Sequence, residues 1–342
     1  METSSTELST NKDAIRGILQ NMGLINNDDP FSARPLTGGV SSNILKVRVG
    51  ERQFCLKQAL AQLKVEKVWH APLERVFAEI EWMRTVAAIA PDAVAHIQGV
   101  DRDALCFAMD YLPAEQYANW KTQLLDGEID VDFAAQLGGL LGYIHQKTAR
   151  SEAMAAAFAY DDNFFSLRLD PYLGEIARVH PRYAERILAV MERTRNTKLA
   201  LVHGDISPKN ILRGPTGPVI LDAECAWYGD PAFDLAFCLN HLLLKVLIAD
   251  TPQAQETLLQ ACAALQSRYF SAITWETADA FEARVAALLP CLLLARVDGK
   301  SPVEYLNNAQ AQKARRLSCA LLDQQCTHLQ AIISFWKKEN GL

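Results

Sequence analysis

The sequence predicts an α+β fold in two lobes, with a small antiparallel-sheet N-lobe followed by a larger, mainly helical C-lobe. Residues 44–57 alternate apolar and polar side chains on both sides of a glycine-containing turn, which is typical of a β-hairpin. After residue 112 the apolar spacing is mostly helical, apart from a β-rich island at 199–221. We therefore expect an N-lobe of residues 1–111 and a C-lobe of residues 112–342.

The expected N-lobe elements follow one another with short connections. A short amphipathic helix comes first, and a glycine-containing loop at 37–42 leads into the hairpin. Pro72 favours the first turn of a helix, because its ring presets φ and the first turn leaves its N–H groups unpaired. The expected helices span residues 13–22 and 73–88. The expected strands span residues 44–49, 53–57 and 105–111.

The composition describes a globular protein with a large core. Apolar residues make up 50% of the 342, and the formal net charge is -6. No basic run is present, so a nucleic-acid partner is not expected, since phosphate backbones need clustered Lys and Arg. The apolar runs are too short to cross a bilayer, and the polar segment Met1–Asn11 does not resemble a signal peptide. We expect a cytoplasmic protein without a membrane partner.

The eight cysteines are scattered along the chain without a C-x-x-C pair, which argues against a zinc site. Most lie in apolar stretches and are expected to be buried thiols in a reducing compartment. The sequence leaves the oligomeric state open, and a homodimer is kept as one expectation.

The β-rich island brings two oxygen-bearing side chains to one end of a predicted hairpin. Residues 214–217 have turn composition between two short apolar strands, so the hairpin is centred near residue 216. That centre sets Asn210 beside Asp222, and Mg²⁺ bound to phosphates takes one or two such oxygen ligands. Asp205, a few residues earlier, is then close enough to accept a proton from an attacking hydroxyl.

Phosphoryl transfer asks for few protein groups. It needs a metal on the phosphates, a cation on the phosphates that stay behind, and a carboxylate that orients the nucleophile. Lys57 offers the cation from mid-strand, where a charged side chain is otherwise out of place. Glu79, on the helix that follows, is expected to hold Lys57 in position, with Glu81 as the competing partner.

Three motifs resemble those of the aminoglycoside phosphotransferase and choline kinase group, relatives of protein kinases. His203-Gly204-Asp205 with Asn210 is similar to the catalytic loop of that group. Leu221–Glu224 is similar to its metal-binding Asp-x-Glu, and Gly229–Asp234 to the segment that follows. The resemblance covers about residues 36–240 and implies a protein-kinase-like two-lobed fold.

Within the group, Leu56–Ala59, Glu74-Arg75 with Glu79, and the segment Phe233–Asn240 look most like methylthioribose kinase. The resemblance implies an ATP-dependent kinase that requires Mg²⁺, with Asp205 as the catalytic base. His203 and Asp234 would support the catalytic loop. The implied metal ligands are Asn210, Asp222 and Glu224, and the implied nucleotide-binding residues are Lys57, Glu79, Gly38, Gly39, Ser41, Ser42, Met109 and Tyr111.

Some residues keep a second interpretation. Glu224 is either a metal ligand or a structural acid. Trp227 and Tyr228 either contact the substrate or fill the core, the core being favoured. Arg296 belongs to a polar cluster at 294–301 that either closes the acceptor pocket or ends a helix. The pair of glycines in the phosphate loop is alternatively a simple turn.

The short run between Asp222 and Asp234 argues for a small acceptor. Its eleven residues leave no room for an activation segment that docks a peptide, and Gly204 stands where a protein kinase carries Arg. The predicted function is transfer of the γ-phosphate of ATP to a hydroxyl of a sugar, thiosugar or amino alcohol. Two alternatives stay open, a catalytically silent nucleotide-binding regulatory relative and an aminoglycoside-modifying kinase. Basic residues recur at 296–316, and their charges would disfavour a polycationic acceptor. We therefore favour a neutral or anionic polyol.

Overall fold

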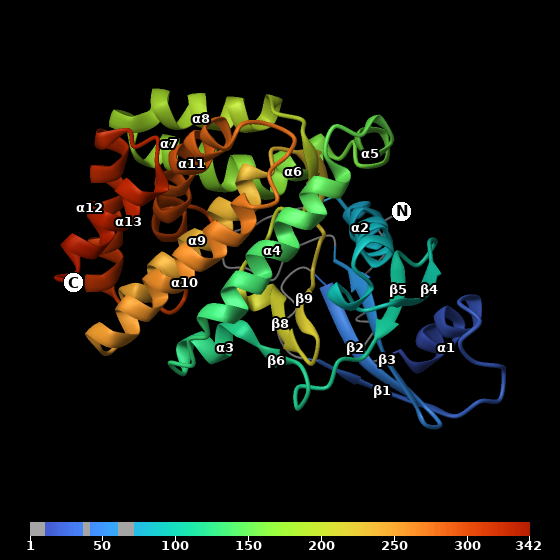
Figure 1. Cartoon of the computed structure of the whole chain (residues 1–342). Helices are drawn as coiled ribbons and strands as arrows, with labels where there is room; N and C mark the ends of the chain where they lie inside the picture. The colour runs from blue at the N-terminus through green and yellow to red at the C-terminus, as the bar shows by residue number, and fades with distance from the viewer. Residues whose placement is uncertain (1–10, 37–41, 61–71) are drawn as a thin grey trace. The chain divides into compact units, whose positions relative to one another are not determined.

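The computed structural model describes residues 11–36, 42–60 and 72–342. The chain divides into two units, Met1–Pro113 and Ala114–Leu342. An antiparallel sheet forms the centre of the first unit, and helices make up most of the second (Figure 1). The predicted α+β fold class is therefore confirmed.

The sheet of the first unit consists of β1 Phe31–Pro35, β2 Ser42–Val49, β3 Arg52–Ala59, β4 Ile97–Asp101 and β5 Cys106–Asp110. Its strand order is β1-β2-β3-β5-β4, and every neighbouring pair is antiparallel. The predicted hairpin lies at its centre, with Val49 opposite Arg52. Strands β1 and β4 were not predicted, because they are short, and β4 also shifts register between Ile97 and Gly99.

Two helices cover opposite faces of this sheet, α1 Lys12–Asn21 and α2 Arg75–Ile89, and the 3-10 turn η2 Pro91–Ala93 follows α2 (Figure 1). Both helices begin and end within about two residues of their predicted bounds. Helix α1 packs Ile15 and Leu19 into one core cluster with Leu56 of β3. Because successive strand residues point to opposite faces, Lys57 points toward the α2 side, where it meets Glu79.

The second unit surrounds two small sheets with helices. Its strands are β6 Ala118–Asn119, β7 Ala200–Val202, β8 Ile211–Gly214, β9 Gly217–Ile220 and β10 Trp227–Gly229. Strand β7 pairs with β10, and β8 pairs with both β6 and β9. Its longer helices are α4 Val131–Thr148, α8 Ala184–Asn196, α9 Ala232–Val246, α10 Pro252–Phe270, α11 Ala278–Asp298, α12 Asn308–Gln324 and α13 Leu329–Glu339. Its shorter helical segments are α3 Trp120–Leu125, α5 Glu152–Ala157, α6 Asp161–Phe164, the π-helix η3 Phe165–Gly174, α7 Glu175–Val179, and the 3-10 turns η4 Pro181–Tyr183 and η5 Pro208–Asn210.

Helices α4 and α10 run side by side because glycines let their backbones approach closely (Figure 1). A Cβ atom on Gly138 would come within 2.1 Å of the Leu265 carbonyl oxygen, so no larger residue fits there without a shift. The close approach brings His145 of α4 to Tyr269 of α10, with 2.6 Å between Nδ1 and the hydroxyl oxygen. His145 also contacts Asp234, which accepts a hydrogen bond from the His203 N–H.

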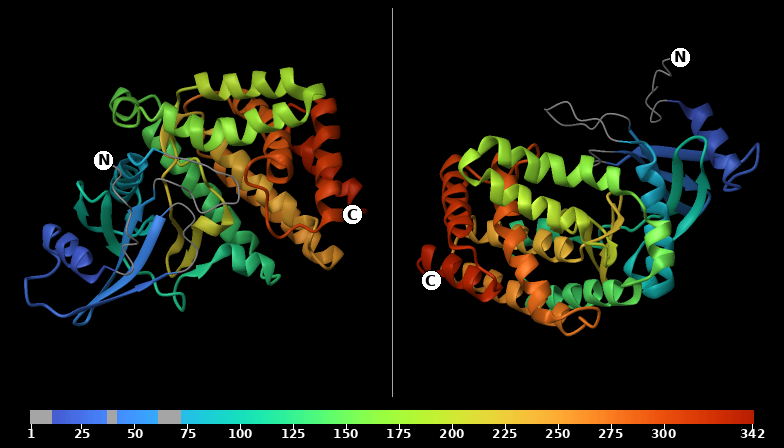
Figure 2. Two further views of the ribbon diagram at one scale, coloured as in Figure 1. Left: turned by 180° about the vertical axis from the view of Figure 1, so that it is seen from behind. Right: turned by 90° about the horizontal axis from the view of Figure 1, so that it is seen from above.

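Helix α9 is buried along its whole length and packs against both α10 and α11. Figure 2 shows α12 and α13, in red, at the end of the unit beyond α11. The buried residues of α9 include the ionisable Asp234, His241 and Lys245. Buried ionisable groups are costly unless they are paired or neutral, so each of them calls for an explanation.

Within the described ranges, none of the helices has the length and the sustained hydropathy that a bilayer crossing would require. All eight cysteines have free thiols, and six of them are buried, as the apolar sequence around them led us to expect. Burial raises the pKa of the Cys55 thiol to about 11, which makes it an unreactive core residue.

Candidate active site

The hairpin formed by β8 and β9 differs by one position from the predicted one. Asn210 lies opposite Leu221, whose N–H donates to the Asn210 carbonyl at 2.9 Å. Asp222, the expected partner, lies one residue beyond Leu221 and has a φ of 67°. This left-handed conformation is uncommon for a residue with a Cβ, and Asp tolerates it better than most. The chain therefore turns sharply just after the hairpin ends, and this turn sets the direction of the Asp222 side chain.

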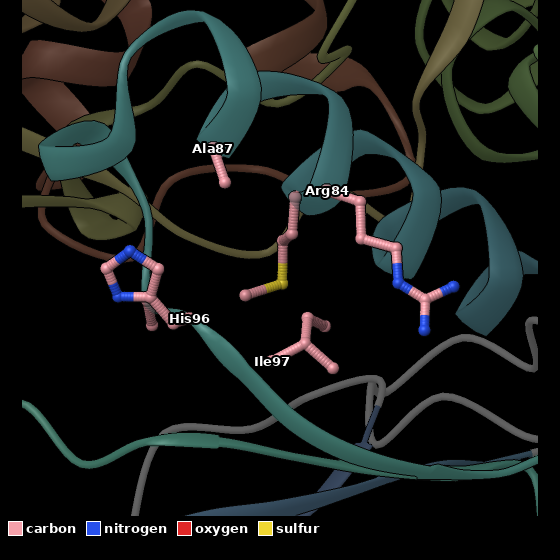
Figure 3. Close-up of a pocket in the computed structure, with 6 residues that line it drawn as sticks. Arg84, Ala87, His96 and Ile97 are labelled. Carbon is pink, nitrogen blue, oxygen red and sulfur yellow. The ribbon is translucent and has the colours of Figure 1, made fainter.

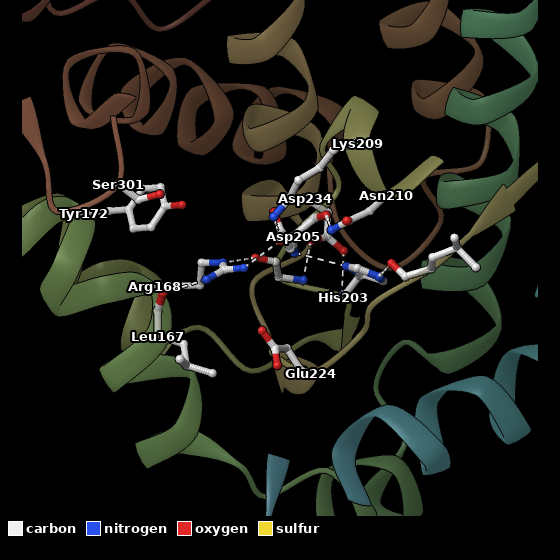
Figure 4. Close-up of polar contacts among 12 residues, drawn as sticks. Leu167, Arg168, Tyr172, His203, Asp205, Lys209, Asn210, Glu224, Asp234 and Ser301 are labelled. Atoms are coloured by element: carbon white, nitrogen blue, oxygen red, sulfur yellow. Dashed lines mark hydrogen bonds and ion pairs between the residues drawn. The ribbon is translucent and has the colours of Figure 1, made fainter. Parts of the chain in front are cut away.

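Asp205 is buried and held by two cations, as Figure 4 shows. Its Oδ2 lies 2.9 Å from an Nη atom of Arg168 and 3.2 Å from Nζ of Lys209. Arg168 also donates from Nε to the Gly204 carbonyl at 2.5 Å. Arg168 thus fixes both the Asp205 carboxylate and the backbone of the loop that begins at His203. Neither this role of Arg168 nor the pairing of Lys209 was predicted.

The two cations keep Asp205 ionised. Burial raises the pKa of Asp205, but the charges of Lys209 and Arg168 outweigh it and hold the pKa below its usual value. The carboxylate is therefore negatively charged at neutral pH. A fixed, ionised carboxylate can accept a hydrogen bond from an alcohol and orient its oxygen for attack.

His203 is a neutral link between the loop and the hairpin. Its Nδ1 accepts from the Asp205 N–H at 3.1 Å, which places the ring proton on Nε2. That Nε2 lies 3.1 Å from the Leu221 carbonyl, to which it donates. Burial lowers the pKa of His203, so the ring does not take up a second proton at neutral pH.

Asp234, in the first turn of α9, fixes the start of the same loop. Its two carboxylate oxygens accept from the His203 N–H at 2.7 Å and from the Gly204 N–H at 2.8 Å. The Nε2 atom of His145 lies 3.3 Å away, and Tyr269 in turn holds the other ring nitrogen. Donors around a fully buried carboxylate offset the loss of its hydration. The loop is thereby tied to α4, α9 and α10.

Gly204 is confined by its backbone and by its neighbours. It has a φ of 80°, and a Cβ atom there would come within 2.8 Å of the Cys225 carbonyl oxygen. We expect Gly204→Ala to lower the free energy of unfolding by about 2–4 kcal/mol, since left-handed strain and overpacking add. Urea denaturation measures this loss. Gly127→Ala is the matched control, because Gly127 has the same φ of 80° with open space around it. Equal losses in the two variants would contradict the crowding at Gly204.

The two cations on Asp205 should differ in their contribution to stability. The Arg168 side chain is 7% exposed and that of Lys209 is 51% exposed. We expect Arg168→Met to cost about 3 kcal/mol, because a buried carboxylate loses its main partner, and Lys209→Met to cost about 1 kcal/mol or less. Urea unfolding of both variants checks the order. A larger loss in Lys209→Met would show that Arg168 is not the principal support of Asp205.

The predicted magnesium ligands offer two carboxylates and one amide. Asn210 donates through Nδ2 to the Asp205 carbonyl at 3.0 Å, which leaves its Oδ1 as the atom that can face a metal. Asp222 is half-buried, and Glu224 is 7% exposed. Among the described residues, no three His, Cys, Asp or Glu side chains gather into a metal cage. Such a sparse oxygen set fits Mg²⁺, which retains waters and takes phosphate oxygens of its substrate.

Lys57 and Glu79 form the ion pair expected in the first unit. Lys57 Nζ lies 2.7 Å from Glu79 Oε1, and both side chains are buried. The competing Glu81 instead pairs with Arg84 on the exposed side of α2, at 3.0 Å. The helix thus presents one carboxylate to the sheet and the other to solvent.

Two of the remaining residues predicted to bind nucleotide lie in strands of the same sheet. Ser42 begins β2 and is buried, and Met109 lies in β5. Tyr111 follows that strand, and Lys46 Nζ lies 3.5 Å from the centre of its ring. Gly38, Gly39 and Ser41 lie outside the described residues.

Of the two interpretations of Trp227 and Tyr228, the structure supports the favoured one, a place in the core, rather than contact with substrate. Trp227 is 1% exposed and stacks on Phe164, with 4.1 Å between the ring centres. The Tyr228 hydroxyl donates to the Leu199 carbonyl and accepts from the Ser151 N–H, both at 2.9 Å. The pairing of β10 with β7 carries both side chains into the core, which leaves them inaccessible to an acceptor.

Arg296 lies in the last turn of α11, and the following residues fold back onto η3. It donates through Nη1 to the Tyr172 hydroxyl at 3.0 Å and to the Ser301 carbonyl at 2.5 Å. The Lys300 N–H donates to the Pro171 carbonyl at 3.0 Å. The 294–301 segment therefore contains the end of α11, and the guanidinium of Arg296 is half-buried beside η3.

A pocket of about 270 Å³ opens in the first unit beside α2 and β4 (Figure 3). None of the predicted site residues lines it. Its His96 is engaged with Asp110, at 3.1 Å between Nδ1 and Oδ2. The lining consists of Met83, Arg84, Ala87, Ala95, His96 and Ile97.

Comparison with known proteins places most of the chain in one group. The model of a family described as "Phosphotransferase enzyme family" matches residues 32–265. The methylthioribose kinase of Exiguobacterium sibiricum is 25% identical over 259 residues, covering 68% of this chain and 66% of that protein. That of Klebsiella pneumoniae strain 342 is 24% identical over 267 residues, covering 69% and 66%. The chain thus spans just under two thirds of the length of these curated relatives.

Solved structures agree on the fold. An amicoumacin kinase in complex with AMP-PNP, Ca²⁺ and Ami superposes with a TM-score of 0.57 at 12% identity, over 93% of this chain and 95% of that one. A choline kinase from Cryptosporidium parvum Iowa II superposes with a TM-score of 0.54 at 10% identity, over 92% and 96%. At such low identities the likeness shows a shared fold.

Proposed function

Because the chain belongs to the phosphotransferase enzyme family, we propose that it is a kinase that transfers the γ-phosphate of ATP to a hydroxyl group of a small molecule. The observation that carries this proposal is Asp205, an ionised carboxylate held in one position by Arg168 and Lys209. A charge kept this firmly at a buried position is well suited to orienting a nucleophile. The names of the relatives, all of them small-molecule kinases, support the same reaction class.

In the proposed reaction, Asp205 accepts a hydrogen bond from the acceptor hydroxyl and takes its proton as the oxygen bonds to the γ-phosphorus. The bond from the γ-phosphorus to the β,γ-bridging oxygen breaks, ADP leaves, and the proton passes from Asp205 to solvent. Asn210, Asp222 and Glu224 would hold Mg²⁺, which neutralises charge on the phosphate oxygens when bound. Lys57, positioned by Glu79, would bind the phosphates that remain on ADP.

The acceptor is proposed to be a small sugar, thiosugar or amino alcohol rather than a peptide or an aminoglycoside. Eleven residues between Asp222 and Asp234 leave no peptide-docking segment. The cations around Asp205 would repel a polycationic antibiotic. A silent regulatory relative is the second candidate, and the presence of Lys57, Asp205, Asn210 and Asp222 together argues against it.

A coupled assay of ADP release tests the proposed function. Purified protein would be incubated with ATP, Mg²⁺ and a panel of sugars, thiosugars, amino alcohols and aminoglycosides, with and without EDTA. We expect ADP release that requires both an acceptor from the first three classes and the metal. ADP release with aminoglycosides alone would show that the acceptor is an aminoglycoside and not a member of the first three classes. No acceptor-dependent release, despite bound nucleotide, would favour the silent relative.

A further inference from the structure

One face of α9 carries ionisable side chains that the proposed reaction does not use. Phe237, His241 and Lys245 recur every fourth residue and therefore share a face of the helix. Lys245 is 1% exposed and His241 is 6% exposed. A lysine that is almost fully buried normally has a carboxylate partner.

Lys245 has no such partner among the residues that the structure describes. Its ammonium lies over the ring of Tyr305, 4.3 Å from the ring centre. Three buried polar atoms of the same cluster also lack a hydrogen-bond partner within the described ranges. They are Nε2 of His241, Nε of Arg296 and the hydroxyl of Tyr305. Buried polar atoms are nearly always satisfied, so these atoms point to a group that binds here.

The charge of the cluster is positive. Lys121 pairs with Glu304 at its exposed side. Burial, followed by the charges of Lys121 and Arg296, lowers the pKa of Lys245 to about 7, with Glu304 acting in the opposite direction. Burial and the neighbouring cations also lower the pKa of His241 well below its usual value. An anion would relieve this repulsion and restore the proton on Lys245.

Direct contacts connect this cluster to Asp205. Arg296 donates to the Tyr172 hydroxyl at 3.0 Å, and the Tyr172 ring centre lies 5.6 Å from Cζ of Arg168. Arg168 in turn pairs with Asp205 at 2.9 Å. Figure 4 shows Arg168 between Tyr172 and Asp205, with Ser301 beside Tyr172. A molecule bound at the cluster would therefore lie on the acceptor side of the catalytic carboxylate.

We propose that the acceptor is a hydroxyl-bearing oxyanion whose carboxylate or phosphate group binds Lys245, Arg296 and Tyr305 while its hydroxyl is presented to Asp205. This inference rests on the proposed kinase function. It narrows the acceptor from polyols in general to acidic ones, such as sugar acids or phosphorylated polyols. Guanidinium, ammonium and phenol groups together form the donor set that such oxyanions favour.

Thermal shift with inorganic phosphate tests the anion site without requiring turnover. The protein would be measured with and without saturating Mg²⁺ and AMP-PNP, so that phosphate at a nucleotide site is recognised and discounted. We expect phosphate to raise the Tm of wild type, and the apparent Kd to rise about tenfold or more in Lys245→Met and in Tyr305→Phe. Acetate and phosphate are compared to separate a carboxylate site from a phosphate site.

Two features of the design keep the result interpretable. Methionine replaces a buried charge by an apolar chain of similar length, and Tyr305→Phe removes a single unpaired hydroxyl, so both variants should fold. Lys147→Met is the matched control, because Lys147 also lies over a ring, that of Tyr143 at 5.3 Å, but on the exposed side of α4. An unchanged phosphate Kd in both cluster variants would overturn the anion site.

Turnover of paired acceptors then separates the inference from the function on which it rests. Each sugar acid or sugar phosphate is compared with its neutral parent sugar. We expect kcat/KM to favour the acid, and Lys245→Met to abolish most of that preference while neutral sugars are affected less. A higher kcat/KM for the neutral sugars would overturn the anion-binding inference but would not contradict the proposed kinase function. Lys245-dependent phosphate binding without any turnover would retain the anion site and refute the kinase.

Discussion

Replacing Asp205 with Asn is expected to reduce turnover by about 10²–10⁴-fold while Mg²⁺-nucleotide binding is retained. The amide keeps the shape of the side chain but cannot take the proton of the acceptor hydroxyl. The proposal gives Asp205 no contact with nucleotide, so its charge should affect kcat far more than the affinity for AMP-PNP. Steady-state ADP release and calorimetric titration of Mg²⁺ and AMP-PNP measure the two quantities.

Stability must be followed in the same variant, because Asp205→Asn leaves Arg168 and Lys209 without their shared negative partner. We expect a lowered Tm, and the kinetics are therefore taken well below it. Asp161→Asn provides the control, since Asp161 also pairs with a lysine, Lys198, but on the surface. If Asp205→Asn turned over as fast as Asp161→Asn, Asp205 would have no role in the reaction.

Replacing Lys57 with Met is expected to damage both stability and activity. Lys57 and Glu79 are a buried pair at 2.7 Å, and removing one partner leaves a buried charge that costs about 3–5 kcal/mol. Loss of the cation on the phosphates should lower kcat/KM for ATP by about 10²-fold or more, because it stabilises charge that builds up in transfer. Chemical denaturation and ATP kinetics measure the two effects.

The double variant Lys57→Met with Glu79→Leu separates these two effects. Removing both charges together should recover most of the stability, because two apolar side chains replace a costly buried pair. Activity should stay low, since the Lys57 cation proposed to bind the phosphates is still missing. Recovery of activity together with stability would mean that the Lys57 charge has no part in catalysis and that the pair only supports α2.

Local sequence patterns predicted much of the fold. The alternation across residues 44–57 predicted the central hairpin, and Pro72 with the spacing after it predicted α2. The Lys57 to Glu79 pairing followed from the placement of a charged residue in mid-strand. The turn at 214–217 located the second hairpin, yet its register came out one position off, because the composition of a turn does not fix which residues pair across it.

Features that depend on distant contacts were missed. Arg168 lies in a π-helix containing Pro171, 37 residues before the carboxylate that it holds, and nothing in its own sequence neighbourhood indicates that contact. The basic cluster did leave a signal, since Lys245 interrupts an otherwise apolar run. The sequence does not show what surrounds Lys245. In the fold its side chain is buried beside Tyr305, and the charge of Arg296 acts on its ammonium group. Strands β6 and β10 are two and three residues long, too short to produce a periodic pattern.

Phosphorus NMR of the complete reaction tests the central claim most directly. Protein, ATP, Mg²⁺ and a mixture of sugars, sugar acids and polyols are followed with time, beside the same mixture containing Asp205→Asn. The proposed kinase predicts a new phosphomonoester signal that grows in step with ADP in wild type and is nearly absent in the variant. Formation of inorganic phosphate alone, or unchanged ATP in a protein shown to bind it, would contradict the claim.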